Sequence, residues 1–207
     1  MNESVDRLGR ISSLALVVIG VMYFLVLAIW FASHGLVAPI VDPTLAIMET
    51  LTLLSAPLMV VMMAAVHAHA ADARKVYGVI ALAFMILVAG MTSAVHFVEL
   101  TAVRQLGSSG IMWPSRSYAV ELLAWNPVLG LSLLFAAPVF PGNGVEAGVR
   151  RGLYVSGVLC LAGVVGPVVG HMRLQLIGLL GYAVVFPIVC YMLFNVFRGG
   201  TAVGSAH

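Results

Sequence analysis

The chain has 207 residues, of which 62% are hydrophobic and only 9% are charged. Several apolar runs of about twenty residues match the length that a helix needs to cross about 30 Å of hydrocarbon. This composition excludes an ordinary soluble globule. The formal net charge of +2, without a long basic run, also excludes nucleic acid as a partner.

The apolar runs predict an all-α, polytopic integral membrane protein, a single transmembrane domain of six bundled helices. An outer-membrane barrel is excluded because it needs short strands that alternate apolar and polar residues. The expected spans are residues 11–32, 44–66, 76–98, 117–140, 152–170 and 174–197, with a disordered tail at 198–207. Short loops join the spans, so consecutive spans should form antiparallel hairpins. The first run lacks a small-residue cleavage motif, so we expect it to be retained as a span.

Lysine and arginine in the loops predict the orientation, because they concentrate in cytoplasmic loops. With the N-terminus inside, seven basic residues fall on the inner side and three on the outer side. The inner set is Arg7, Arg10, Arg74, Lys75, Arg150, Arg151 and Arg198, and the outer set is Arg104, Arg116 and Arg173. Both termini should therefore be cytoplasmic, and the size of the protein favours a bacterial inner membrane. A homo-oligomer is compatible with these features.

Polar side chains gather at the expected outer face, above all between His96 and Asn126. Glu49 and Glu121 lie deepest, each within the outer third of a span. An ionisable group inside a bilayer costs about 2.5–3.5 kcal/mol on insertion scales, so it usually faces a cavity or a partner. We therefore expect a site at this face that is shared among several spans.

Acid–base chemistry is what these residue types can perform. Glu49, Glu121 and His96 are the expected catalytic residues, since a buried carboxylic acid can donate a proton and a neighbouring base can accept one. The expected substrate-binding residues are Trp113, Arg116, Tyr118, Trp125, Asn126, His171, Arg173 and Gln175. The aromatic members can stabilise a developing positive charge by cation–π attraction. No metal or cofactor is expected.

Each feature also has a structural interpretation. Tryptophan and tyrosine at span ends often anchor a helix at the membrane interface. Glu99 and Arg104 can form a surface ion pair, and the two glutamates can form helix-to-helix hydrogen bonds. The HAHAAD sequence that begins at His67 resembles a metal motif, but Asp72 is its one obvious further ligand. Cys160 and Cys190 fall in apolar runs and behave there as small hydrophobic residues.

The pattern favours an intramembrane enzyme that acts on a lipophilic, isoprenoid or lipid-like substrate. Protonation-initiated cyclisation or double-bond isomerisation suits its carboxylates and histidine; by analogy, small membrane terpene cyclases share this plan. One alternative is a proton- or cation-coupled transporter that uses Glu49 and Glu121. A second is a haem or metal protein with His96 and His171 as ligands. A third is a non-enzymatic assembly subunit.

Overall fold

A computed structural model of the chain describes residues 3–36, 38–107 and 112–203. These residues form helices joined by short loops, and no strand occurs among them. In the described part, six helical stretches are long and apolar enough to cross a membrane, which suggests an integral membrane protein. The predicted all-helical class and the six apolar stretches are confirmed.

The six stretches are built from uninterrupted and broken helices. The first three are α1 (Glu3–His34), α2 (Thr44–His69) and α3 (Lys75–Val98), the last preceded by η1 (Asp72–Arg74) and extended by η2 (Glu99–Val103). The fourth consists of α4 (Arg116–Leu123), η3 (Ala124–Val128), α5 (Leu129–Ala136) and η4 (Ala137–Val139). The fifth consists of α6 (Val145–Gly163) and α7 (Val165–Val168). The sixth consists of η5 (Met172–Gln175), α8 (Leu176–Leu179), η6 (Leu180–Val185) and α9 (Phe186–Val203).

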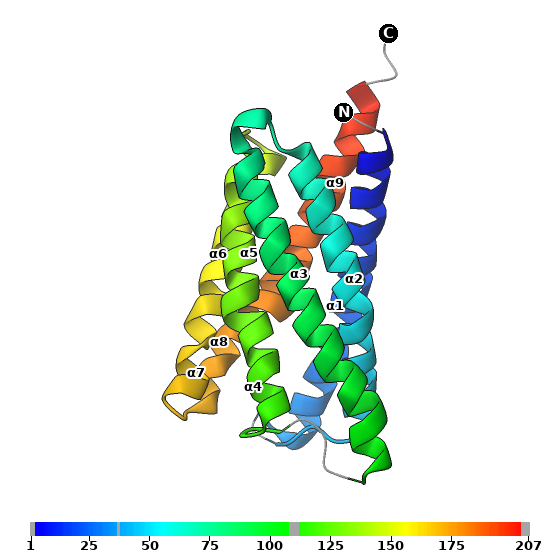
Figure 1. The fold of residues 1–207 in the computed structure, drawn as a ribbon, viewed down its shortest axis with the longest axis vertical. Helices are drawn as coiled ribbons and strands as arrows, with labels where there is room; N and C mark the ends of the chain where they lie inside the picture. The colour runs from blue at the N-terminus through cyan, green and yellow to red at the C-terminus, as the bar shows by residue number, and fades with distance from the viewer. Residues whose placement is uncertain (1–2, 37, 108–111, 204–207) are drawn as a thin grey trace.

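The stretches run up and down along one long axis (Figure 1). Both termini lie at one end, which we call the terminal end. The opposite end carries the α1–α2 loop and the start of α4, and we call it the pocket end. Helices extend beyond the predicted spans at several places: α1 begins at Glu3, α6 begins at Val145 and α9 continues to Val203. The other residues of the predicted tail, 204–207, lie outside the described residues.

Packing follows the order of the chain around the bundle. Helix α1 packs against α2 and α9, α3 against α2 and α5, and α6 against α5 and α9. Large apolar side chains fill the terminal half of the bundle. Those at most 1% exposed include Met62, Met63, Met85, Leu133, Phe140, Leu153, Leu193 and Phe197. Many other apolar side chains face outward, as expected where lipid is the solvent.

Within the described residues, three segments are wound as π-helix: η2, η3 and η6. Proline explains two of them, because its ring collides with the carbonyl four residues earlier and it lacks an amide hydrogen. Pro127 lies within η3, and Pro187 lies four residues after Ala183 of η6. A π-turn widens the helix locally, and such turns are frequent at functional sites.

Small residues allow three helices to approach around Asn126, whose side chain is fully buried. A Cβ added at Gly163 would lie 2.5 Å from Oδ1 of Asn126 and 2.6 Å from the Cα of Gly178. Glycine is therefore required here by close packing, as in other helical membrane proteins.

We expect Gly163→Ala to destabilise the protein by about 1–3 kcal/mol, because the new methyl group meets backbone atoms that cannot move aside. Gly90→Ala on α3 is the matched control, since a Cβ there meets no atom within 4 Å. Thermal unfolding in detergent should show a lower Tm for the first variant and an unchanged or slightly higher Tm for the second. Equal Tm values would contradict the close packing around Asn126.

Candidate functional site

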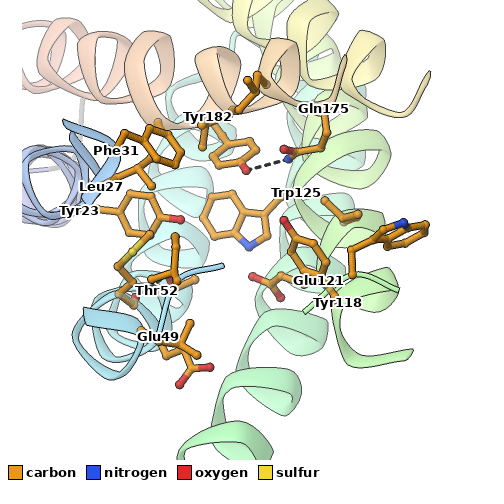
Figure 2. Close-up of a pocket in the computed structure, with 18 of the residues that line it drawn as sticks. Tyr23, Leu27, Phe31, Glu49, Thr52, Tyr118, Glu121, Trp125, Gln175 and Tyr182 are labelled. Carbon is orange, nitrogen blue, oxygen red and sulfur yellow. Dashed lines mark hydrogen bonds between the residues drawn. The ribbon is translucent and has the colours of Figure 1, made fainter. Parts of the chain in front are cut away.

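A cavity of about 780 Å³ opens in the half of the bundle nearer the pocket end. Its walls come from α1, the α1–α2 loop, α2, the end of α3, the α4–η3 segment and the η5–α9 segment. Side chains from these elements converge on the cavity (Figure 2). The volume falls in the range of small-molecule sites, about 300–1,000 Å³. Most lining residues are apolar, and the polar ones include Tyr23, Glu49, Thr52, Ser55, His96, Tyr118, Glu121, His171, Arg173, Gln175 and Tyr182.

A buried histidine–glutamate pair lies on the cavity wall. Nε2 of His96, on α3, lies 2.8 Å from Oε1 of Glu121, on α4. The hydroxyl of Thr92 donates to the other oxygen, Oε2, at 3.4 Å. The side chains of His96 and Glu121 are only 7% and 11% exposed. The pair can therefore hold a proton between two groups that both face the cavity.

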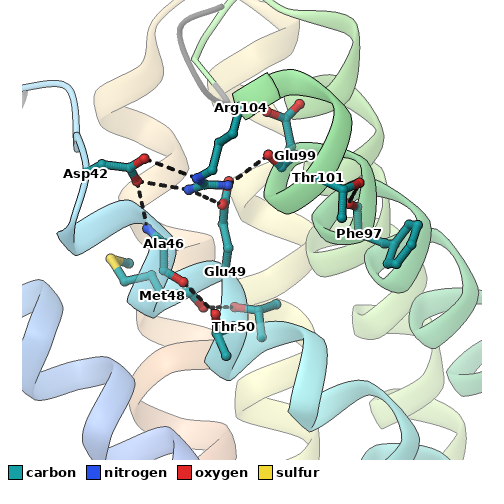
Figure 3. A network of polar contacts seen from close by, with 10 residues as sticks. Asp42, Ala46, Met48, Glu49, Thr50, Phe97, Glu99, Thr101 and Arg104 are labelled. Atoms are coloured by element: carbon teal, nitrogen blue, oxygen red, sulfur yellow. Dashed lines mark hydrogen bonds and ion pairs between the residues drawn. The ribbon is translucent and has the colours of Figure 1, made fainter. Parts of the chain in front are cut away.

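A second buried carboxylate, Glu49 of α2, is held by an ion pair. Nη2 of Arg104 lies 2.8 Å from Oε2 of Glu49, whose side chain is 1% exposed. The same guanidinium donates to both carboxylate oxygens of Asp42, at 3.1 and 2.9 Å (Figure 3). Arg104 thus ties the end of the third stretch to the α1–α2 loop and to α2. These hydrogen bonds from Arg104 hold the pKa of Asp42 below its ordinary value of 3.8.

Glu99 differs from its predicted surface role. Nη1 of Arg104 donates to the carbonyl oxygen of Glu99 at 2.8 Å, so the contact joins the guanidinium to the backbone. The side chain of Glu99 is buried, and its Oε2 has no hydrogen-bond partner among the described residues. The ionic partners of Arg104 are Asp42 and Glu49, both distant in sequence.

Aromatic side chains surround the middle of the cavity. The rings of Trp125 and Tyr182 lie 5.3 Å apart, and Tyr23 projects from α1 into the same space (Figure 2). Tyr182 accepts a hydrogen bond of 3.1 Å from the amide of Gln175. Nearer the pocket end, Trp113 and Tyr118 pack edge to face, with ring centres 6.4 Å apart.

The structure brings most of the predicted site residues to this cavity. Nine line it: Glu49, His96, Trp113, Tyr118, Glu121, Trp125, His171, Arg173 and Gln175. Two are placed elsewhere. Arg116 lies exposed at the start of α4, and Asn126 points toward Gly163 and Gly178 because the π-turn of η3 directs it between helices.

Several lining residues were not predicted. Tyr23 lies in a uniformly apolar run, where the sequence offers no signal that a side chain faces a cavity. Thr52 and Ser55 lie in the same span as Glu49, but small hydroxyl side chains also occur on lipid-facing and packed surfaces of such spans. Tyr182 carried a weak signal, since it stands seven residues after Gln175, about two helical turns. The motif at His67 leads elsewhere, because Nε2 of His69 lies 3.7 Å from Glu146 near the terminal end.

Comparisons of the chain with models of known protein families, with curated proteins and with solved structures found no match.

We expect Arg104→Ala to destabilise the protein by about 1–3 kcal/mol, because Glu49 is left as an unpaired buried carboxylate. Adding Glu49→Gln to this variant should restore part of the loss, since the amide carries no charge. Tm values of the two variants in detergent measure the difference. A further decrease in Tm on adding Glu49→Gln would contradict the prediction that the Glu49–Arg104 ion pair stabilises the fold.

The Asp42–Arg104 contact also predicts a pH dependence. A carboxyl with a lowered pKa in the folded state stabilises the fold above its unfolded value and loses that contribution as pH falls through its folded pKa. For Asp42 this loss lies below pH 3.8. Tm measured from about pH 5 to about pH 2 should fall less steeply in Asp42→Asn than in the wild type. Glu3→Gln, at an exposed site on α1, should keep the wild-type slope; an unchanged slope in Asp42→Asn would contradict the prediction.

Proposed function

We propose that the protein is an intramembrane enzyme that moves a proton on a lipophilic substrate. The observation that carries the proposal is the His96–Glu121 pair, buried and facing a largely apolar cavity. A general acid or base acts within hydrogen-bond reach of its substrate, and this pair offers both roles at one place. The cavity offers the apolar surroundings that an isoprenoid or lipid-like molecule requires.

The reaction class that fits these groups is cyclisation or double-bond isomerisation. The acid of the pair gives a proton to one carbon of a double bond, and the electron pair of that bond forms the new C–H bond. The neighbouring carbon becomes cationic, and the faces of Trp125 and Tyr182 can stabilise it. Loss of a proton from a different carbon to the base of the pair then forms a new double bond. The pair recovers its proton, so no oxidant or reductant is consumed.

Glu49 has a supporting role in this proposal. Its ion pair with Arg104 keeps a charged group at the cavity wall without leaving it uncompensated. Arg104 joins Glu49 to the α1–α2 loop through Asp42, so the carboxylate is also held in place. Glu49 can thus contribute electrostatic stabilisation to a cationic intermediate.

A transporter has less support from the same geometry. Beyond Met59 the terminal half of the bundle is filled mainly by tightly buried apolar side chains such as Met62 and Phe197, and its buried polar groups are serines and the single acid Asp6 among the described residues. A proton or cation path would need polar groups there. A haem ligated by His96 also competes with Glu121, which already occupies Nε2 of that histidine.

The proposed setting is a bacterial inner membrane with the termini in the cytoplasm. The basic residues Arg74, Lys75, Arg150 and Arg151 lie toward the terminal end, which the positive-inside rule places in the cytoplasm. The cavity would then open toward the outer leaflet.

Glu121→Gln tests the enzyme directly, because the amide keeps the size of the side chain but cannot exchange a proton in the same way. Cyclisation and isomerisation conserve mass, so lipid extracts of cells with and without the protein should differ by a compound of unchanged mass and altered chromatographic retention. We expect this compound to fall roughly 10²–10⁴-fold in Glu121→Gln.

Glu3→Gln serves as the control, since Glu3 lies exposed at the terminal end. Glu49→Gln should give an intermediate loss. Wild-type amounts of product in both Glu121→Gln and Glu49→Gln would sink the proposal, provided that both variants fold and are recovered in wild-type yield.

A further inference from the structure

The cavity is elongated along the axis of the bundle. Its lining residues on α1 extend from Leu16 to Phe31, which a rise of 1.5 Å per residue converts to about 22 Å. Those on α2 extend from Leu45 to Met59, about 21 Å. A volume of about 780 Å³ spread over this length is narrow. The space therefore suits one extended chain better than a compact or multi-chain molecule.

The chemical character of the lining side chains changes with their distance from the pocket end. Glu49 and Glu121 each lie five residues inside their helices, about 8 Å from the pocket end. Tyr23, Trp125 and Tyr182 lie nine to eleven residues inside their stretches, about 15 Å deep. The polar residues are thus followed by an aromatic layer.

Below the aromatic layer the lining becomes wholly apolar. Leu16 and Ile19 of α1, Met59 of α2 and Phe186 of α9 form the floor. Met59 is fifteen residues inside α2, about 22 Å from the pocket end. The floor adjoins the tightly packed core of the terminal half. A ligand in this cavity therefore meets charged side chains near the pocket end, the hydroxyl groups of Tyr23, Ser55 and Tyr182 at middle depth, and apolar groups at the floor.

We infer that the ligand is a single-chain amphiphile that binds with its apolar tail on the floor and its one polar or unsaturated end beside Glu121. That end is uncharged. The two acids that line the cavity already have partners, Arg104 for Glu49 and His96 for Glu121, so a third carboxylate beside them would be repelled by both. The cation Arg173 also lines the cavity, but it lies exposed at the pocket end, one residue inside its stretch, so it does not offset this repulsion at the depth of Glu121. The inference rests on the proposed function, since it names the substrate class of the same cavity, but chain binding can be measured without turnover.

Straight-chain alcohols of increasing length test the inference on the purified full-length protein. Octanol, dodecanol, hexadecanol and eicosanol are added at one fixed mole fraction of detergent, and Tm is recorded for each. A ligand that binds the folded state raises Tm. In the wild type the increase in Tm should grow with chain length and stop once the tail reaches the floor. Hexadecanoic acid, ionised at neutral pH, should raise Tm less than hexadecanol.

Two substitutions should change, in opposite directions, the chain length above which Tm no longer increases. Ser55→Leu places a larger side chain about 16 Å deep and should shorten the longest chain that still adds to Tm. Met59→Ala removes part of the floor and should lengthen it. Thr50→Leu, the same kind of substitution on the exposed face of α2, should leave the wild-type pattern unchanged. If Ser55→Leu does not fold, Ala183→Leu at a similar depth on η6 replaces it.

An identical chain-length pattern in the wild type, the Ser55 or Ala183 variant and Met59→Ala would overturn the inference. So would a steady increase in Tm without a stopping point, because simple partitioning into detergent gives that result. Equal increases in Tm with hexadecanol and hexadecanoic acid would contradict the claim that the polar end of the ligand is uncharged.

Failure of the proposed function gives a different result. Glu121→Gln keeps the shape of the cavity, so it should retain the wild-type chain-length pattern whether or not turnover is lost. If Glu121→Gln keeps both the chain-length pattern and wild-type turnover, the proposed proton chemistry is wrong, whereas the inferred chain-binding site is supported. If Glu121→Gln loses turnover and neither it nor the wild type shows a chain-length pattern, the inferred chain-binding site is wrong, whereas the proposed proton chemistry is supported.

Discussion

Pairing of buried charges is the constraint on which the site depends. An isolated carboxylate in apolar surroundings is too costly to keep, so each buried acid needs a partner or a proton. Of the acids that line the cavity, Glu121 has His96 and Glu49 has Arg104. Both partnerships join residues from different helices, so the pairs form only when the helices are correctly packed. The polar chemistry and the tertiary structure are consequently specified together.

The cavity lies beside irregular segments of two stretches. Regular apolar helices in a bundle pack closely and leave few voids. Here the fourth and sixth stretches carry π-turns at Ala124–Val128 and Leu180–Val185, associated with Pro127 and Pro187. The turns carry Trp125 and Tyr182, whose rings meet inside the cavity. Gly163 of the fifth stretch and Gly178 of the sixth lie against Asn126, so the fourth and sixth stretches both pack closely on the fifth.

The sequence predicted the helices and the side of the bundle on which polar groups gather, because both depend on long-range averages such as run length and loop position. Individual partners were harder to predict. Arg104 was paired with its neighbour Glu99, whereas the fold brings it to Asp42 and Glu49 across 62 and 55 positions of sequence. Asn126 was expected at the site, but one residue of π-winding changes the direction of a side chain. Tyr23 was missed because a cavity-facing tyrosine and a lipid-facing one occur in the same apolar context.

In the proposed function, the proton-carrying groups and the α1 part of the cavity lining belong to different helices. The acids and their partners come from α2, α3, α4 and the residues just after η2, whereas α1 supplies apolar and aromatic lining. Helix α1 packs chiefly against α2 and α9, and many of its large side chains face outward. Substitutions on its inward face can therefore change the length or shape of the tail that fits without disturbing the His96–Glu121 pair. Under the proposed function, this division lets one arrangement of proton-carrying groups serve chains of different lengths.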